Sequence, residues 1–115
     1  MRGGIASALA ASVALAGSVA MAGPANADQY DFIAELDNAG VWYADMFDMI
    51  DIGKELCHEL RHGVSPPLVL GKLANTGFAP AESAIVLMSA VNHLCLDAKP
   101  VVVGWARDQG YVGPL

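Results

Sequence analysis

The first 27 residues set the tightest limit on what the rest of this chain can fold into. One positive side chain, Arg2, precedes an uncharged stretch over residues 3–23 that is rich in Ala, Val, Gly and Ser. Pro24 ends this stretch, and the Ala-Asn-Ala sequence at residues 25–27 has the small-x-small pattern that signal peptidase cleaves. We therefore predict a secretory signal peptide over residues 1–27 and a mature chain that begins at Asp28.

A retained transmembrane helix is the alternative for the same stretch. A spanning helix needs about 20 strongly apolar residues, whereas this stretch is diluted by Gly and Ser and is followed directly by the cleavage pattern. No Cys stands at the predicted cleavage point, which argues against a lipid-modified N-terminus. We therefore expect the mature protein to be secreted, in the cell envelope or outside the cell, without a transmembrane anchor.

The predicted mature chain, residues 28–115, is small and acidic. It carries 12 Asp and Glu against five Lys and Arg, a net charge of −7. A chain of this length can build one domain with a thin core. Nucleic acids and anionic membrane surfaces are bound through clusters of positive charge, and no such cluster is present. We therefore expect no nucleic-acid partner.

Two cysteines, Cys57 and Cys95, both lie in the predicted mature chain. An even pair in a small exported domain indicates a structural disulfide. A redox dithiol is the alternative, but it needs cysteines about one helical turn apart, as in Cys-x-x-Cys. We predict a structural bond between the two, which would stabilise the fold by roughly 3–4 kcal/mol on the chain-entropy estimate.

Helical spacing of apolar residues dominates the mature chain, and strand alternation is nearly absent. The tail from Lys99 onward is compatible with a strand at Val101–Val103 and with a short helix. We expect an all-α fold, a small orthogonal bundle of four or five short helices closed by one disulfide. The predicted helices span about 28–39, 48–62, 66–75 and 80–96.

The predicted helix over 48–62 has the clearest apolar stripe. Asp48 is its expected N-cap, and Gly63 is expected to end it. Its core-facing residues are Met49, Ile52, Gly53, Leu56, Cys57 and Leu60, and those of the helix over 80–96 are Ala81, Ala84, Leu87, Met88, Val91 and Cys95. Each cysteine is thus predicted to lie on the buried side of an amphipathic helix, which is a second reason to expect them to bond.

Residues 58–62 read His-Glu-Leu-Arg-His and match the H-E-x-x-H pattern of zinc peptidases. On a helix, His58 and His62 share a face and could both bind zinc, while Glu59 would act as the general base. On the predicted helix, however, both histidines lie opposite the apolar stripe, on the charged side that faces water. A catalytic zinc needs a shaped and partly dry cleft.

A third zinc ligand is also difficult to find for this motif. The candidates are His93, Glu82 and Asp97, and the first two point away from the face that carries Cys95. The longer H-E-x-x-H-x-x-G pattern fails as well, since Gly63 follows the second histidine directly. We therefore predict a solvated helix face with weak metal binding at most, no metal site and no cofactor.

Three aspartates near the start of the helix over 48–62 could form a cation site. Asp45, Asp48 and Asp51 lack the Gly and the terminal Glu of a calcium loop, so they are interpreted as a charged helix start.

The aromatic residues Trp42, Tyr43 and Phe47 could form an exposed recognition patch. Core packing is the favoured interpretation, because so small a domain has few large apolar side chains with which to build its core.

The predicted signal peptide is followed by Phe32 and Leu36 with Gly40 as a stop, by Gly53, Cys57, Leu60 and Gly63 spaced as Gly-x-x-x-Cys-x-x-Leu-x-x-Gly, and by a helix that closes on Cys95. In these features the segment from Asp31 to Cys95 resembles a family of small secreted actinobacterial proteins, domain of unknown function 732. The tail departs from that family, since Leu96 stands where the family usually has Pro.

This resemblance implies an exported, helical domain closed by a disulfide, with no established activity. It supports the pairing of Cys57 with Cys95. We expect a single domain over 28–115, with a family-like core at 31–95 and a divergent tail at 96–115. The expected function is non-catalytic binding of a protein or small-molecule partner. The alternative is a small zinc metallopeptidase that uses His58, Glu59 and His62.

Overall fold

The computed structural model describes residues 28–115, so the predicted signal peptide lies outside the described residues. Residues 28–38 are helical, and four further α-helices follow, with a short 3-10 helix, η1, before the last. Residues 28–115 contain no strand, which confirms the all-α prediction. The elements are α2 (Met46–Arg61), α3 (Pro66–Asn75), α4 (Pro80–His93), η1 (Leu96–Ala98) and α5 (Lys99–Asp108).

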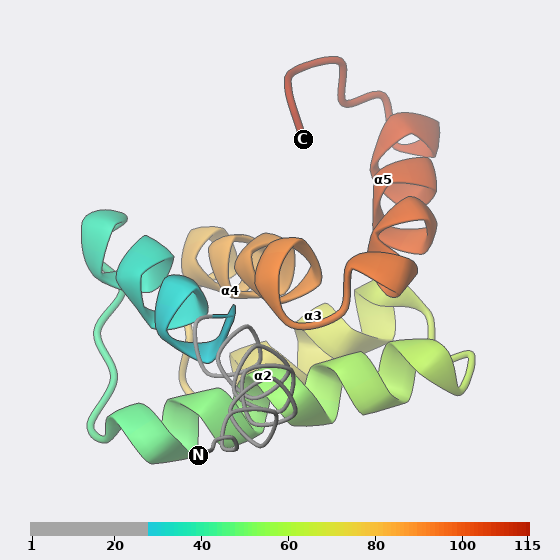
Figure 1. The fold of residues 1–115 in the computed structure, drawn as a ribbon. Coiled ribbons are helices and arrows are strands. Elements are labelled where there is room, and N and C mark those ends of the chain that lie inside the picture. The colour runs from blue at the N-terminus through green and yellow to red at the C-terminus, as the bar shows by residue number, and fades with distance from the viewer. Residues whose placement is uncertain (1–27) are drawn as a thin grey trace, which may run out of the picture.

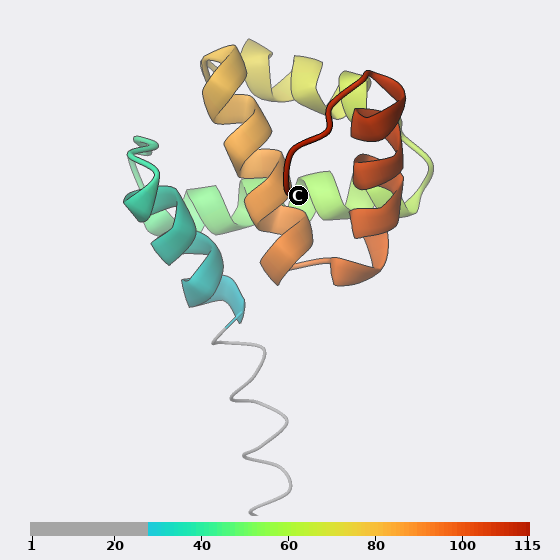
Figure 2. The same cartoon turned by 90° about the horizontal axis from the view of Figure 1, so that it is seen from above.

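The helix α4 is the centre of the bundle. It contacts α2, α3, η1 and α5, and Figures 1 and 2 show it crossing α2. The N-terminal helix, residues 28–38, lies beside α4 above the start of α2 (Figure 1). It places Phe32, Ile33 and Leu36 in the core, whereas Tyr30 is exposed. The α5 helix lies on the opposite side of the bundle from the N-terminal helix, where it contacts α4, η1 and α3 (Figure 1).

The helix α2 begins two residues earlier than predicted, because Asp45 rather than Asp48 caps it. The Asp45 backbone is extended, and its Oδ1 accepts a hydrogen bond of 2.9 Å from the backbone N–H of Phe47. Gly63, with φ of +87°, follows the end of the helix as predicted. The predicted stripe is buried except for Ile52, which is half-buried, while Ile50 is buried in addition.

Gly53 of α2 allows three segments to meet closely. A Cβ at this position would lie 2.6 Å from Cδ1 of Leu94 and 2.9 Å from Cζ of Phe32. Real side chains do not approach this closely, so only Gly lets the ring of Phe32 and the end of α4 pack onto α2 together. The glycine in the middle of the helix is therefore a packing requirement, although Gly is a poor helix former.

The predicted extent of α4 was wrong, and its predicted face was correct only in part. The helix ends at His93 instead of reaching Leu96; Leu87 and Val91 are buried as predicted, whereas Ala81 and Ala84 are exposed. Because α4 is covered by neighbours on several sides, its buried residues do not form one stripe. They are Ser83, Val86, Leu87, Ser89, Ala90 and Val91.

Cys95 is consequently buried but not helical, which corrects the prediction that both cysteines lie on amphipathic helices. It precedes η1 with φ of −148° and ψ of 67°, a backbone conformation that is neither helical nor extended. Its sulfur is bonded to that of Cys57 over a Cα–Cα distance of 5.8 Å. The predicted disulfide is present and ties α2 to the segment that follows α4.

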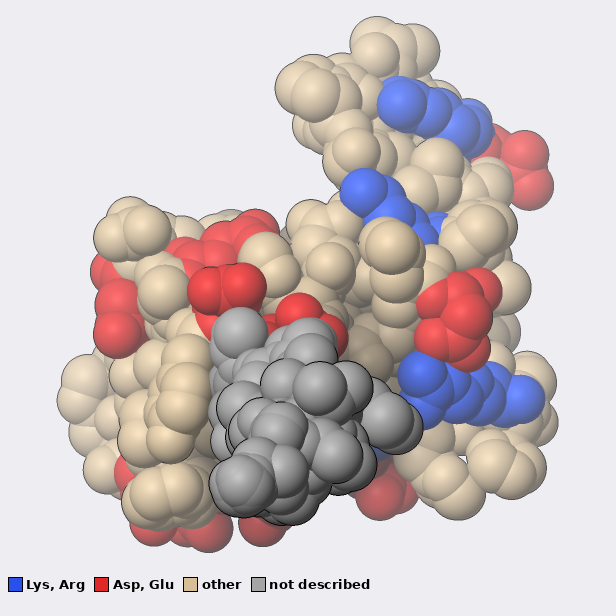
Figure 3. Space-filling model, viewed as in Figure 1, with Lys and Arg blue, Asp and Glu red and all other residues tan. Residues whose placement is uncertain are grey.

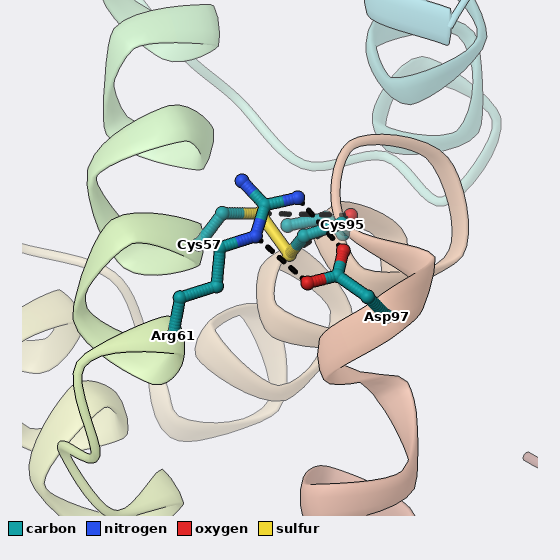
Figure 4. Close-up of a disulfide and its surroundings, with 5 residues drawn as sticks. Cys57, Arg61, Cys95 and Asp97 are labelled. Carbon is teal, nitrogen blue, oxygen red and sulfur yellow. Dashed lines mark hydrogen bonds and ion pairs between the residues drawn. A yellow bond between two sulfur atoms is a disulfide. The ribbon is translucent and has the colours of Figure 1, made fainter.

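An ion pair spans the same two segments as the disulfide (Figure 4). Arg61 donates from Nε to Oδ2 of Asp97 at 2.9 Å and from Nη2 to Oδ1 at 2.7 Å. This two-pronged hydrogen bonding raises the pKa of Arg61 and lowers the pKa of Asp97. Both side chains are about half exposed, so solvent screens the pair, which serves more to orient η1 than to stabilise the fold.

The chain after Cys95 is a helix rather than a strand, which decides between the two predictions for the tail. Pro100 lies in the first turn of α5, where the missing N–H would have no partner within the helix. Val102 is the buried residue of this helix, and Val101 is exposed. Among the described residues no single helix is long and apolar enough to cross a membrane. The helix α4 and the segment Leu96–Asp108 taken together have the length and apolar composition of a membrane span, but the pair is bent by 115°.

Replacing both cysteines, Cys57→Ser with Cys95→Ser, should lower the free energy of unfolding by about 3–4 kcal/mol. The open chain regains the entropy that a cross-link between residues 38 positions apart removes. Since about 1 kcal/mol moves a domain of this size by about 4–8 °C, the Tm followed by circular dichroism should fall by well over 10 °C. A Tm within a few degrees of the wild type would show that the bond does not constrain the unfolded chain.

Gly53→Ala should destabilise the protein by about 1–3 kcal/mol, because the added methyl group would clash with Leu94 and Phe32. Gly71→Ala in α3 is the matched control, since nothing lies within 4 Å of a Cβ at that position. It should stabilise by about 0.5–1 kcal/mol, as expected for Ala in a helix. Urea unfolding measures both, and stabilisation of both variants would contradict the close packing at Gly53.

Candidate functional site

The H-E-x-x-H residues lie on the outer face of α2. His58 and His62 are exposed, and their ring centroids are 4.2 Å apart. Nδ1 of His62 lies 2.8 Å from the carbonyl oxygen of His58, to which it donates when Nδ1 carries the proton. Glu59 accepts a hydrogen bond of 2.7 Å from Nζ of Lys72 on α3. The base that a zinc peptidase would need is therefore engaged in an ion pair between two helices.

The candidate third ligands of zinc are used elsewhere. His93 donates from Nε2 to Oε1 of Glu35 at 2.6 Å. Glu82 accepts from the backbone N–H of Ala79 at the start of α4, and Asp97 is paired with Arg61. Within residues 28–115 no three His, Cys, Asp or Glu side chains are grouped closely enough to hold a metal ion. The fold does not bring the residues of the zinc hypothesis together.

An apolar cleft of about 610 Å³ lies between α4, α5 and the C-terminal residues. We name it the α4–α5 cleft. Its largest apolar side chains are Ile85 and Met88 from α4 and Trp105 from α5. The remaining apolar lining comes from the turn after the N-terminal helix, α3, α4, α5 and the chain end: Ala39, Leu70, Ala84, Leu87, Val102, Ala106, Pro114 and Leu115.

The cleft exists because α5 turns away from the bundle. The chain turns at η1, so that α5 is bent by 115° from α4 while it still contacts α4, η1 and α3. The α5 residues that line the cleft are Val102, Trp105, Ala106 and Gln109, which have the i, i+3, i+4 and i+7 spacing of one side of a helix. Figure 3 shows α5 and the chain end projecting above the neighbouring surface.

The last residues of the chain form one wall of the cleft. Arg107 donates from Nη1 to the carbonyl oxygens of Tyr111 and Gly113 at 3.1 and 2.6 Å. The hydroxyl of Tyr111 donates to the carbonyl oxygen of Pro114 at 3.1 Å. These bonds fold the chain back from the end of α5 toward α4, as Figure 2 shows, and bring Leu115 to the lining.

Few polar side chains reach the α4–α5 cleft. They are Glu35, Asn92, Gln109 and Tyr111. Glu35 is the carboxylate among them, and it is held by His93. The arrangement offers a large apolar surface with hydrogen-bonding groups at a few points, which is the composition of small-molecule sites. No Ser, Thr, Cys or His side chain is among the residues that line the cleft.

Sequence reasoning missed this cleft, although one signal for it was present. The i, i+3, i+4 and i+7 spacing from Val102 to Gln109 is typical of a one-sided helix. The three consecutive valines at 101–103 obscured it by favouring a strand. The face predicted for α4 included Ala84 and Met88. Both side chains line the α4–α5 cleft, on the side opposite α5.

The aromatic residues were predicted to pack in the core, and for two of the three this is wrong. Trp42 is 75% exposed and Phe47 is 65% exposed. Tyr43 is half-buried, and its hydroxyl donates to Oδ1 of Asp37 at 2.7 Å, which raises the pKa of the phenol. The aspartates at 45, 48 and 51 form a charged start of α2, as predicted.

The sequence profile of a family described as "Protein of unknown function (DUF732)" matches residues 27–97. No curated protein and no solved structure matches the chain. The matched range contains the predicted family-like core at 31–95 and ends before α5 begins. The side chains that α5 and the chain end contribute to the α4–α5 cleft therefore lie outside it.

The double substitution His58→Ala with His62→Ala should change the free energy of unfolding by less than about 0.5 kcal/mol, since both side chains are exposed. Leu60→Ala, between them but buried, should cost about 2–5 kcal/mol. Chemical unfolding and metal analysis of tag-free protein test the comparison. One bound zinc per chain, together with unfolding of the double His variant, would contradict this prediction and support the peptidase alternative.

Proposed function

This chain belongs to the family described as protein of unknown function (DUF732), and from that premise we propose that it is an exported, non-catalytic protein that binds an apolar small molecule in the α4–α5 cleft. Export is supported by the sequence pattern of residues 1–27 and by a disulfide, which is typical of proteins outside the cytoplasm. The ligand would then be met in the cell envelope or outside the cell.

The observation that carries this proposal is the size and lining of the cleft. Its volume of about 610 Å³ falls within the range of about 300–1,000 Å³ that is usual for ligand sites. Ile85, Met88 and Trp105 offer the ligand apolar surface on two facing helices. Each Å² of apolar surface that the ligand covers is worth about 25 cal/mol, so burial of the ligand body would supply most of the binding free energy.

The polar groups of the cleft restrict the ligand further. Asn92 and Gln109 each carry an amide that can donate and accept, whereas the carboxylate of Glu35 is already paired with His93. No Lys or Arg side chain lines the cleft. The best fit is an uncharged or weakly polar molecule with a large apolar body and a hydrogen-bonding group, rather than an anion.

The family match does not extend to the cleft as a whole. Trp105, the chain end and the Arg107 bonds that hold it lie beyond residue 97. The proposal therefore concerns this chain, and the ligand need not be shared by other members of the family. The zinc peptidase alternative is weaker, because Glu59 is paired with Lys72 and the candidate third ligands lie in other pairs.

The neutral apolar dye N-phenyl-1-naphthylamine tests the proposal. In a Trp42→Phe background Trp105 is the sole indole, so its fluorescence should be quenched as the dye enters the cleft and accepts its excitation energy. Ala84→Arg places a long charged side chain at the cleft surface without removing core atoms, and it should weaken dye binding about tenfold or more, the equivalent of about 1.4 kcal/mol.

Ala74→Arg is the matched control, because it makes the same change on the exposed surface of α3 away from the cleft. Its dye affinity should equal that of the parent. Equal dye affinity in the Ala84→Arg protein, or dye binding without a response of Trp105, would refute binding in the cleft.

A further inference from the structure

A second surface, independent of the α4–α5 cleft, joins aromatic rings to carboxylates. It is a groove of about 280 Å³ between the loop 41–45, the first turns of α2 and the turn before α4. We name it the aromatic groove. Its rings and carboxylates are those of Trp42, Tyr43, Phe78, Asp45, Asp48 and Glu82.

The backbone of the loop holds Trp42 outward. Val41 on one side is 5% exposed and belongs to the core, and Tyr43 on the other side is tied to Asp37 by its hydroxyl. The residues on both sides of Trp42 are thus held by contacts within the domain, while the indole itself is 75% exposed. A ligand can therefore cover an indole whose neighbours are already anchored.

The electrostatics of this region favour a cation. Residues 28–53 contain seven Asp and Glu but no Lys or Arg, and residues 73–98 also contain no Lys or Arg. These two stretches supply every residue of the aromatic groove. In Figure 3 the Lys and Arg side chains in view gather over α5 and the end of α2, whereas acidic side chains cover the N-terminal helix and the start of α2.

We propose that the aromatic groove binds a Lys or Arg side chain of a polypeptide partner. The cation would lie against the face of Trp42, where the ring quadrupole attracts positive charge, and close to the carboxylate of Asp48. Its hydrocarbon stem would cover the indole and Phe78. Asp45 and Glu82 accept from backbone N–H groups and keep lone pairs free for a ligand.

A polypeptide fits this surface better than a small free cation. The groove volume lies just below the usual range for small-molecule sites. The ring of Phe47 is 65% exposed in the same turn of α2 as Asp48 but is not part of the groove. A partner chain can bury this ring beside the groove, whereas a cation of a few atoms cannot. Exposed aromatic side chains next to complementary charge are typical of the energetic centres of protein interfaces.

Fluorescence anisotropy of a labelled synthetic peptide made of Lys, Leu and Ala tests the proposal, with a second peptide in which Gln replaces every Lys. The Lys peptide should bind, and its affinity should fall as salt is added. Trp42→Ala and Asp48→Asn should each weaken binding by about fivefold or more, as expected from losing a cation–π or charge contact. Circular dichroism of both variants should show an unchanged Tm, because both side chains are exposed.

Matched control variants distinguish binding in the groove from nonspecific hydrophobic binding and from an effect of net charge. Leu68→Ala removes a side chain that is 63% exposed on α3, and Asp108→Asn removes the same charge from the end of α5; both should bind the Lys peptide like the wild type. Ala84→Arg should also bind it normally, so failure of the cleft proposal would leave this one standing.

Several outcomes would overturn the proposal. Absence of binding, equal binding of the Gln peptide or equal weakening by the control variants would each do so. Displacement of the peptide by tetramethylammonium at the same concentration would assign the groove to a small cation. Sedimentation showing a dimer that Trp42→Ala dissociates would assign the surface to a second copy of this chain.

Discussion

The bond between Cys57 and Cys95 joins the middle of the bundle to the point where the chain leaves it, and the rest of the arrangement follows from that junction. Because Cys95 lies two residues after the end of α4, the bond fixes the end of that helix against α2. Arg61 and Asp97, each about one helical turn or less from a cysteine, pair across the same gap and orient η1. The direction of α5, and with it the α4–α5 cleft, therefore depends on a covalent link made at the residue immediately before η1.

A domain of this size cannot cover all of its apolar surface, and both proposed sites are consequences of that limit. α5 buries Val102 but shares Trp105 with an open cleft, which the chain end covers on one side only. Trp42 stays exposed between a buried neighbour, Val41, and a half-buried one, Tyr43, whose hydroxyl is bonded to Asp37. The two surfaces differ in charge: no cation and one paired carboxylate line the cleft, whereas the aromatic groove has three carboxylates and no cation.

The buried residues of a helix could be predicted from the sequence where only one side of that helix is buried. In α2 the apolar stripe from Met49 to Leu60 matched the burial closely, and the same stripe placed His58 and His62 in water. In α4 the prediction failed because the helix is surrounded: Ser83 and Ser89 are buried although Ser is a polar residue, and Ala81 is exposed although Ala is apolar. Hydrophobic spacing identifies a face only when solvent covers the opposite one.

The amino-acid sequence by itself determined the helical class, the pairing of the two cysteines and the acidic character, because each depends on residue type and local spacing. Only the tertiary structure decided that the tail forms a helix standing off α4, that Trp42 faces solvent and that the α4–α5 cleft exists. These features depend on contacts between segments far apart in the chain, such as His93 with Glu35 and Gly53 with both Phe32 and Leu94. Such contacts leave no periodic pattern within any one segment, because the requirement for each residue is set by its distant partner.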